Sequence, residues 1–557
     1  MDTQRLILFF VFSFSLLMLW TEWEKEQRPK PATIAAAAQQ PKEAKGIPGA
    51  VPTPATAAAP TAIPAAAPAT APAAVKGEIV QIRTDLLVAD IDTLGGSVTR
   101  IELLKHKEAD DQSKNLVLLG PEHQYFAQSG LTGDGGPNHR SLWRVLPGER
   151  TLGEGKSTLE LRLAADGKDG LAVEKVYTFK RDTYSIDVAI EMRNGGSAPV
   201  APHAYFQLTH DGKQPAGGSS LAQSFGAQSF NGFAQYTSER KFEKLQFSDI
   251  DKGKPDHLKQ ASDGWIAFVQ HYFVAAWVPG GTGQRDYVME KRPDGVYGGR
   301  VVMPVATIAP GATAKVSAPL YAGPQEQRRL QDVAPGFDLV VDYGWLTIIA
   351  WPLFWLLEKY HSIAGNWGVA IILLTVTLKL VFFPLSAASY RSMAKMKLVT
   401  PRLTKIREMY ANDRARQNQA MMELYKTEKI NPLGGCFPIL VQIPVFIALY
   451  WVLLAAIELR HAPFMLWIHD LAALDPFYVL PILMTVTMVI QTKLNPVPPD
   501  PVQAKVMMFM PFVFSIFFFF FPAGLVLYWL VNNILSIAQQ WQIQRMFERD
   551  RPAHAKR

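Results

Sequence analysis

The chain has 557 residues, 48% hydrophobic residues and a formal net charge of +7. This length accommodates several domains, and the C-terminal half holds most of the long apolar runs. The single cysteine, Cys436, excludes an intrachain disulfide. No HExxH, GxSxG, phosphate-loop or zinc-type spacing occurs, so the sequence predicts a protein that is not an enzyme and that needs no metal or cofactor.

The N-terminal apolar stretch from Leu6 to Trp20 is typical of a cleaved signal peptide or of an uncleaved membrane anchor. An acidic run, Thr-Glu-Trp-Glu-Lys-Glu, follows at once without a small-residue cleavage site. We therefore expect an anchor over residues 1–24 that starts in the cytosol. Residues 29–76 contain ten prolines and nineteen alanines, so residues 25–77 are predicted to be a disordered linker.

Residues 78–330 have the pattern of a soluble β domain. Apolar and polar residues alternate from Tyr184 to Met192, which indicates a half-buried strand. Glycine pairs that predict turns recur at Gly95-Gly96, Gly195-Gly196, Gly217-Gly218, Gly280-Gly281 and Gly298-Gly299. A segment of this length and pattern predicts one large antiparallel β-sandwich. Its histidines lack metal-type spacing and are interpreted as ordinary surface or core residues: His203, His210, His257 and His271.

Apolar runs of membrane length dominate the C-terminal half. Five strong runs cover 367–385, 434–457, 477–492, 506–521 and 523–538, the last within a predicted span over 523–541. A weaker run lies within 331–362 and contains Pro352, and it is interpreted as an interfacial amphipathic helix with Trp345, Trp351 and Trp355 at headgroup depth. If it crossed the bilayer instead, every later loop would change sides.

The distribution of charge favours the interfacial interpretation. Residues 386–433 carry ten Lys/Arg against four Asp/Glu, whereas residues 458–476 carry Arg460 as their only fixed cation. Cytosolic loops carry the excess of basic residues. We therefore predict six spans with both termini in the cytosol, a cytosolic helical hairpin over 387–432 and a basic cytosolic tail over 546–557.

Lys379 lies within the apolar run 367–385, where a charge costs at least about 2.5 kcal/mol and usually faces protein or water. It is seven residues before Ser386, or roughly 10 Å of helix from the cytosolic end. Further polar residues are predicted to face the same wet pocket: Thr375, Gln442, Asn532, Asn533, Ser536 and Gln540. Two other interpretations stay open, namely snorkelling of Lys379 to the interface and simple interhelical hydrogen bonding by the amides.

Short motifs run through nearly all of residues 340–545, among them Phe383-Pro-Leu-Ser386, Asn431-Pro-Leu-Gly-Gly-Cys-Phe-Pro438, Phe464-Met-Leu-Trp-Ile-His-Asp-Leu471 and Pro522-Ala-Gly-Leu-Val-Leu-Tyr-Trp529. With these motifs the C-terminal half resembles the YidC/Oxa/Alb family of membrane protein insertases. Gly95-Gly96, His271-Tyr-Phe273 and Asp342-Tyr-Gly-Trp345 extend the likeness to the bacterial form. That form implies an α-helical polytopic protein of the bacterial inner membrane, with a five-helix core over 363–545 and an all-β periplasmic supersandwich.

The resemblance also implies site residues. The family's groove carries a positive residue, usually arginine, at the position of Lys379, and a threonine at the position of Thr375. The charge is kept here while the bidentate guanidinium is lost. A tyrosine pair of the family is matched by Tyr528 and Trp529, the second of which keeps the ring without the hydroxyl.

Under this resemblance, a nascent membrane protein places its hydrophilic part in a groove that opens to the cytosol and moves its hydrophobic part into lipid along an apolar slide. The slide residues are Phe437, Phe446, Phe514, Phe517 and Phe518. The runs 477–492, 506–521 and 523–538 have only 16 residues each, about 24 Å of helix against a core of about 30 Å, which favours local thinning of the bilayer.

The cytosolic hairpin is predicted to begin a helix at Thr400-Pro401 and to break at Asn412-Asp413. Its apolar residues either form an adaptable surface for clients or pack the hairpin's own core: Met393, Met396, Tyr410, Met421 and Tyr425, with Met409 and Met422 nearby.

The expected partners are nascent membrane proteins, the lipid bilayer, the Sec translocon and the ribosome, and the chain is expected to work as a monomer. The alternative function is a polytopic transporter or channel. That function predicts polar residues through the midplane and an internal repeat, and the sequence shows neither.

Overall fold

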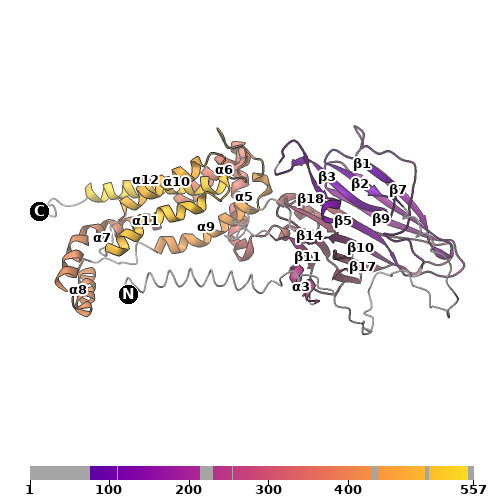
Figure 1. Cartoon of the computed structure of the whole chain (residues 1–557), viewed down its shortest axis with the longest axis horizontal. Helices are drawn as coiled ribbons and strands as arrows, with labels where there is room; N and C mark the ends of the chain where they lie inside the picture. The colour runs from indigo at the N-terminus through magenta and orange to yellow at the C-terminus, as the bar shows by residue number, and fades with distance from the viewer. Residues whose placement is uncertain are drawn as a thin grey trace, which may run out of the picture. The chain divides into compact units, whose positions relative to one another are not determined.

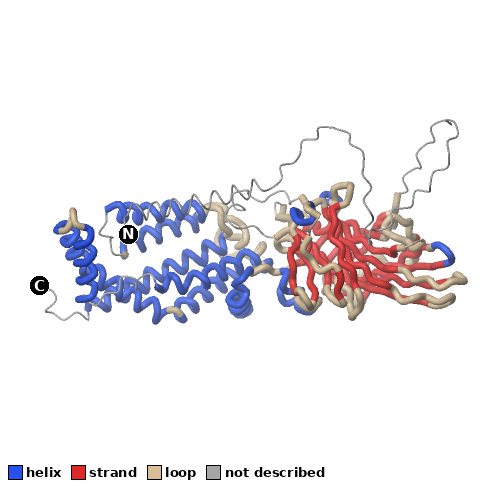
Figure 2. Tube along the Cα trace, turned by 90° about the horizontal axis from the view of Figure 1, so that it is seen from below, coloured by secondary structure: helices blue, strands red, loops and turns tan. Residues whose placement is uncertain are grey.

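The computed structural model describes residues 76–109, 111–133, 135–213, 230–253, 255–428, 437–495 and 501–549. The predicted N-terminal anchor, nearly all of the predicted linker, Gly217-Gly218 and residues 550–557 lie outside these ranges. The chain divides into two compact units. One, here called the β unit, ends at Asp342, and the other, the helical unit, begins at Tyr343 (Figures 1 and 2).

The β unit consists of two nine-stranded sheets in which all strand pairs are antiparallel. The first sheet has the order β1 (Ile79–Arg83), β2 (Leu87–Asp92), β3 (Ser97–Lys107), β5 (Phe126–Thr132), β10 (His203–His210), β17 (Tyr297–Pro304), β16 (Arg285–Lys291) and β13 (Gln260–Ala261), with β4 (Asn115–Leu119) paired to β3. The second has the order β12 (Lys241–Leu245), β11 (Gly232–Thr237), β14 (Trp265–Val269), β15 (Phe273–Trp277), β18 (Thr313–Pro324), β9 (Ser185–Asn194), β8 (Leu171–Lys180), β7 (Thr158–Asp166) and β6 (Arg144–Val145).

The sheets face each other across an apolar core. The indole of Trp277 in the second sheet donates to the Gln207 carbonyl in the first at 2.9 Å, and the ring of Tyr125 lies 5.0 Å from that of Phe268. The predicted alternation around residues 184–192 is confirmed, because β9 buries every second side chain over most of its length. The sequence therefore predicted the sandwich correctly.

Short helices complete the β unit: η1 (Pro121–His123), η2 (Lys168–Gly170), α3 (Phe247–Asp251), α4 (Gln327–Val333) and η3 (Phe337–Val340). The unit continues past the predicted boundary at residue 330 because the segment after it packs on the sandwich. The Trp265 indole donates to the Pro335 carbonyl at 3.1 Å, and the Phe337 ring lies 4.9 Å from Trp265.

The prediction of a turn at Gly298-Gly299 is wrong, since both residues lie inside β17. A Cβ on Gly299 would lie 2.7 Å from the Phe233 ring and 2.9 Å from Ile266, both of the opposite sheet. Glycine is needed there for close approach of the two sheets rather than for a turn. Gly95-Gly96 does form a turn, with positive φ values of 86° and 51°.

A fully buried lysine connects the two sheets. Lys175 on β8 donates to the carbonyls of Gly95 (2.9 Å), Gly96 (3.1 Å) and Ser129 (2.9 Å). Its ammonium lies 4.5 Å from the centre of the Trp143 ring, a cation–π contact. The three N–H donors of one ammonium therefore satisfy three carbonyls and fix the Gly95-Gly96 turn.

Replacing Lys175 with Met should lower the free energy of unfolding of the β unit by about 2–4 kcal/mol, because buried carbonyls would lose their donors. Urea unfolding of the full chain in detergent, followed by tryptophan fluorescence, measures this loss. Lys180→Met is the matched control, since Lys180 lies on the same strand with a half-exposed side chain. Equal midpoints for the two variants would contradict the assigned role.

Burial lowers the pKa of Lys175 from 10.5 to about 7, so the ammonium with its three donors prevails below about pH 7 and the neutral amine, with two N–H donors, prevails above it. Between these values the unfolded chain binds the additional proton, so stability should rise as the pH is raised from about 7 toward 10.5. We expect the unfolding free energy of the wild type to increase over this window by more than that of Lys175→Met. Parallel slopes for the two proteins would show that Lys175 does not carry the effect.

The helical unit contains eight α-helices within the described residues (Figure 1). They are α5 (Thr347–Ala364), α6 (Trp367–Val381), α7 (Phe383–Met409), α8 (Arg414–Thr427), α9 (Phe437–Ala455), α10 (Val479–Leu494), α11 (Pro501–Phe518) and α12 (Ala523–Arg549). Helix α12 packs against α6, α7 and α10, and α5 packs against α6. All five predicted apolar runs lie largely on helices.

Helix ends differ from the predicted runs at specific residues. The run 367–385 breaks after Val381, where α6 and α7 meet at a bend of 66°, because the ring of Pro384 cannot continue the helix. Helix α10 has the predicted 16 residues, whereas α12 continues for 27 residues, beyond its apolar run. Taken singly, none of the described helices has both the length and the apolarity of a bilayer crossing, and α6 with α7 passes that test as a bent pair.

The predicted hairpin is formed by α7 and α8, and Asp413 accepts a capping hydrogen bond from the Arg416 N–H at 3.0 Å. The predicted helix start at Thr400-Pro401 is wrong, since both residues lie within α7. The Thr400 hydroxyl donates to the Met396 carbonyl at 3.0 Å. Burial of Val399 and Leu403, on either side of the proline, offsets the hydrogen bond that Pro401 cannot make.

Candidate functional site

Lys379 is buried in the helical unit, with only 7% of its surface exposed. Its ammonium donates to the Ser536 hydroxyl of α12 at 2.7 Å. That hydroxyl donates in turn to the Asn532 carbonyl at 2.7 Å, and Tyr390 of α7 also interacts with Ser536. Lys379 therefore lies where three helices meet, α6, α7 and α12.

No carboxylate pairs with Lys379 among the residues that the structure describes. A buried cation without a counter-charge is costly unless polar groups or water surround it. Its one hydroxyl partner satisfies one of three ammonium donors. The arrangement thus leaves hydrogen-bonding capacity and positive charge for an incoming polar or acidic group.

Two further predicted groove residues lie near this centre. The Gln442 amide of α9 approaches the Asn532 side-chain oxygen at 3.4 Å, which brings α9 to the same face of α12. Thr375 lies one turn before Lys379 and is buried, and its hydroxyl donates to the Ile371 carbonyl at 2.7 Å. The Thr375 hydroxyl therefore makes its hydrogen bond within α6, and the residue lies on the same side of α6 as Lys379.

The other amides of α12 face a different helix. Asn533 donates to the Thr487 hydroxyl of α10 at 2.9 Å, and Gln540 donates to the Asn495 side chain at 3.1 Å. Successive helical residues point about 100° apart, so Asn533 cannot share the direction of Asn532. Asn533 and Gln540 hold α12 to α10, which is the interhelical interpretation that the sequence left open.

An aromatic cluster lies one to two turns from the polar centre. The Trp529 ring stacks on Phe446 of α9 at 5.1 Å and meets Phe518 of α11 edge-on at 4.6 Å. Tyr528 is almost fully buried beside Phe446, with ring centres 6.0 Å apart. Phe518 is also buried, at 7% exposure, so it packs between helices rather than facing outward.

Two other residues of the predicted slide lie on α11. Phe514 is half exposed, and its ring lies 6.4 Å from that of Phe517. These two rings therefore belong to an apolar surface of α11. The side chain of Phe437, the remaining predicted slide residue, lies outside the described residues.

The exposed apolar face of α11 is larger than the sequence predicted. Phe509, Phe512 and Ile516 are all more exposed than Phe514, and none of the three was among the predicted slide residues. Their spacing of three and four residues places them on one side of a helix. That spacing is the signal that could have identified this face, and the adjacent phenylalanine run 517–521 obscures it.

The predicted hairpin residues divide between a core and an open surface. Met396, Met421 and Tyr425 pack against Val399 and Leu403 in the hairpin core. Met393 and Tyr410 are partly buried, while Met409 and Met422 are exposed at 68% and 53%. Most of the predicted hairpin residues therefore pack in the hairpin core, and Met409 and Met422 are the exposed methionines.

Family models match both units of the chain. The model described as "YidC periplasmic domain" matches residues 79–356, and the model described as "60Kd inner membrane protein" matches residues 359–550. These matches define the class, an inner-membrane protein with a periplasmic domain, which is the β unit.

The curated relatives make the assignment specific. The chain is 54% identical to "Membrane protein insertase YidC" of Aromatoleum aromaticum over 99% of both chains. It is 53% identical to the protein of the same name in Dechloromonas aromatica over 98% of both. A solved YidC insertase structure is 17% identical, with a TM-score of 0.38 over 83% of this chain and 94% of that one.

The chain therefore belongs to the YidC family of membrane protein insertases. Its function is membrane protein insertion, and the family is not enzymatic. The expectation from the sequence motifs is confirmed for the family, the function and the inner-membrane location.

The Thr487–Asn533 hydrogen bond should couple α10 to α12 by about 0.6–1.7 kcal/mol, the range for such pairs in membranes. A double-mutant cycle with Thr487→Ala and Asn533→Ala, measured by unfolding in mixed detergent micelles, gives this coupling energy. Thr485→Ala is the matched control, since its hydroxyl donates within its own helix to Pro481. Equal coupling of Asn533 to both threonines would contradict the assignment.

Proposed function

We propose that this insertase receives the hydrophilic part of a nascent membrane protein in a groove around Lys379 that opens to the cytosol. The hydrophobic part then leaves sideways into the bilayer. The observation that carries the proposal is the buried Lys379 ammonium, which has one hydroxyl partner, Ser536, and no carboxylate partner among the described residues.

The groove lowers the barrier by hydration and charge. A polar or acidic segment loses solvation when it enters hydrocarbon, and a cation with unsatisfied donors offsets part of that loss. Lys379, Ser536, Asn532 and Gln442 provide this polar surface, with Thr375 and Tyr528 beside it. No nucleotide or metal chemistry is needed for such a step.

The hydrophobic part of a client needs an apolar path beside the groove. Phe446 and Trp529 lie at the edge of the polar centre, and Phe514 with Phe517 extends the apolar surface along α11. We place lateral release between α9 and α11, along these rings. Phe518 supports the path from within the helix packing, and Phe437 is assigned to it from its sequence position.

We further propose six spans with both termini in the cytosol. The reasons are the basic segment 386–433, the basic tail and the loop 458–476, in which Arg460 is the only Lys or Arg. In this topology the hairpin of α7 and α8 is cytosolic, α5 lies at the interface, and the residues 1–24 form an anchor joined by the linker 25–77 to the periplasmic domain.

The partners follow from chemistry and location. Nascent membrane proteins are the clients, and the exposed Met409 and Met422 give the hairpin an adaptable apolar contact for them. The basic hairpin face and tail suit ribosomal RNA. We propose that the chain works as a monomer, alone or beside the Sec translocon.

Charge at position 379 should decide insertion of clients with acidic leading segments. Lys379→Arg should insert them as the wild type does, whereas Lys379→Glu should reduce insertion by about tenfold or more, since 1.4 kcal/mol of added repulsion suffices for that factor. Reconstitution in liposomes, with protease protection of the client's terminal segment, measures the yield.

A client whose leading acidic residues are replaced by amides should escape most of the Lys379→Glu defect. Lys493→Glu is the matched control for charge reversal, because Lys493 is exposed at the end of α10. If Lys379→Glu inserts acidic clients as well as the wild type, the electrostatic part of the proposal is wrong.

A further inference from the structure

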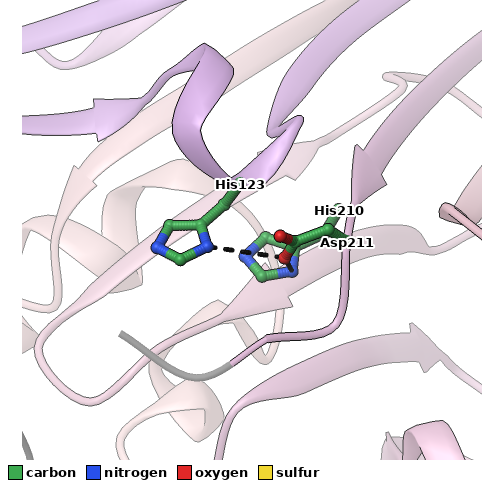
Figure 3. Close-up of side chains that lie close together, drawn as sticks. All are labelled: His123, His210 and Asp211. Atoms are coloured by element: carbon green, nitrogen blue, oxygen red, sulfur yellow. Dashed lines mark ion pairs between the residues drawn. The ribbon is translucent and has the colours of Figure 1, made fainter. Parts of the chain in front are cut away.

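A second polar cluster lies in the β unit, far along the chain from Lys379. His123 ends η1, His210 ends β10 and Asp211 follows it directly. Figure 3 shows the two imidazoles and the carboxylate close together. One nitrogen or oxygen atom from each of the three side chains lies within 4.8 Å of the others.

The fold brings the two segments together through backbone pairing. Strands β5 and β10 are antiparallel neighbours with Phe126 opposite Thr209, so the turn before β5 meets the end of β10. The Asp211 N–H donates to the His123 carbonyl at 2.8 Å, and the Thr209 hydroxyl donates to the Gln124 carbonyl at 2.8 Å. The three side chains are thus held near each other by the sheet itself.

The distances within the cluster suit one small cation. The Asp211 carboxylate oxygen lies 3.4 Å from Nδ1 of His123 and 3.5 Å from Nδ1 of His210. Two ligands bound tetrahedrally at about 2.0–2.1 Å are separated by about 3.4 Å. The carboxylate is therefore already spaced from both imidazoles as it would be around a shared ion.

Within the described parts of the chain, each imidazole has one buried ring nitrogen without a hydrogen bond. For His210, which is fully buried, this is Nε2, whereas its Nδ1, the atom near Asp211, accepts the Gly212 N–H. Nδ1 of His123 is likewise buried without a hydrogen bond there.

Two local features change when an ion binds. The Gly212 N–H donates to Nδ1 of His210 at 2.9 Å, and an ion at that nitrogen replaces this hydrogen bond. The His123 and His210 rings are parallel with centres 5.5 Å apart, so the His123 ring must rotate before both imidazoles can point at one ion. Its side chain is 32% exposed, which leaves one side open to solvent for this rotation and for entry of the ion.

We propose that His123, His210 and Asp211 form a binding site for a divalent transition-metal ion of the Zn²⁺ type, with water as the fourth ligand. Two imidazoles and one carboxylate favour such an ion over Mg²⁺ or Ca²⁺, which take oxygen ligands. The bound ion ties η1 to the end of β10 and adds a second cation beside the Asp211 carboxylate, whose other oxygen lies 3.6 Å from the Lys213 ammonium.

Titration with Co²⁺ tests the site, since tetrahedral Co²⁺ absorbs visible light and Zn²⁺ is spectroscopically silent. The full chain is purified in detergent without a polyhistidine tag and stripped with chelator. We expect one Co²⁺ per chain, displaced by Zn²⁺. Loss of an outer-shell partner already costs about 10–100-fold in affinity, so His123→Ala and Asp211→Asn should each weaken binding by about 100-fold or more.

The matched control is His203→Ala, which removes an exposed histidine from the other end of the same strand and should bind as the wild type does. Unfolding midpoints of the metal-free variants show whether the fold is intact, and Zn²⁺ should raise the midpoint of the wild type and of His203→Ala only. The proposal is overturned if the wild type gives no saturable Co²⁺ band, or if all four proteins give the same band.

Discussion

The interaction on which the helical unit depends is the hydrogen bond from the buried Lys379 ammonium to Ser536, 2.7 Å long and without a carboxylate nearby among the described residues. A paired lysine would be a structural tie between helices. An ammonium with one neutral partner keeps its charge for something that is not part of the chain. Under the proposed function, this difference is what separates a groove for clients from ordinary polar packing between helices.

Helix α12 contributes both to the polar centre around Lys379 and to the packing against α10, because its polar residues lie on two different faces. Asn532 and Ser536 turn toward α6 and α9, while Asn533 and Gln540 turn toward α10. Aromatic rings around Trp529 close the space between α9, α11 and α12. The buried ammonium of Lys175 in the β unit differs from that of Lys379. It donates all three of its hydrogen bonds to backbone carbonyls, so no donor remains for a ligand.

Patterns with a short range were predictable from the sequence. Alternation over residues 184–192 located β9, and the apolar runs located most of the helices. Predictions were wrong where the outcome depends on residues far apart in the sequence. Gly299 allows the two sheets to approach closely and forms no turn. Pro401 lies inside α7 because the residues on both sides of it are buried. The spacing of Asn532 and Asn533 could not show which helix each one faces. His123 and His210 come close together through the pairing of β5 with β10, and no motif in the sequence indicates this proximity.

The most direct measurement is the water accessibility of position 379 from each side of the membrane. Cys436 is the only native cysteine, so Lys379→Cys in a Cys436→Ser background carries a single thiol. Leu380→Cys, whose position is 66% exposed on the outer face of α6, is the control. We predict that a membrane-impermeant thiol reagent labels position 379 from the cytosolic side only and leaves position 380 unlabelled. Labelling of position 379 from the periplasmic side, or from neither side, would contradict a wet groove closed toward the periplasm.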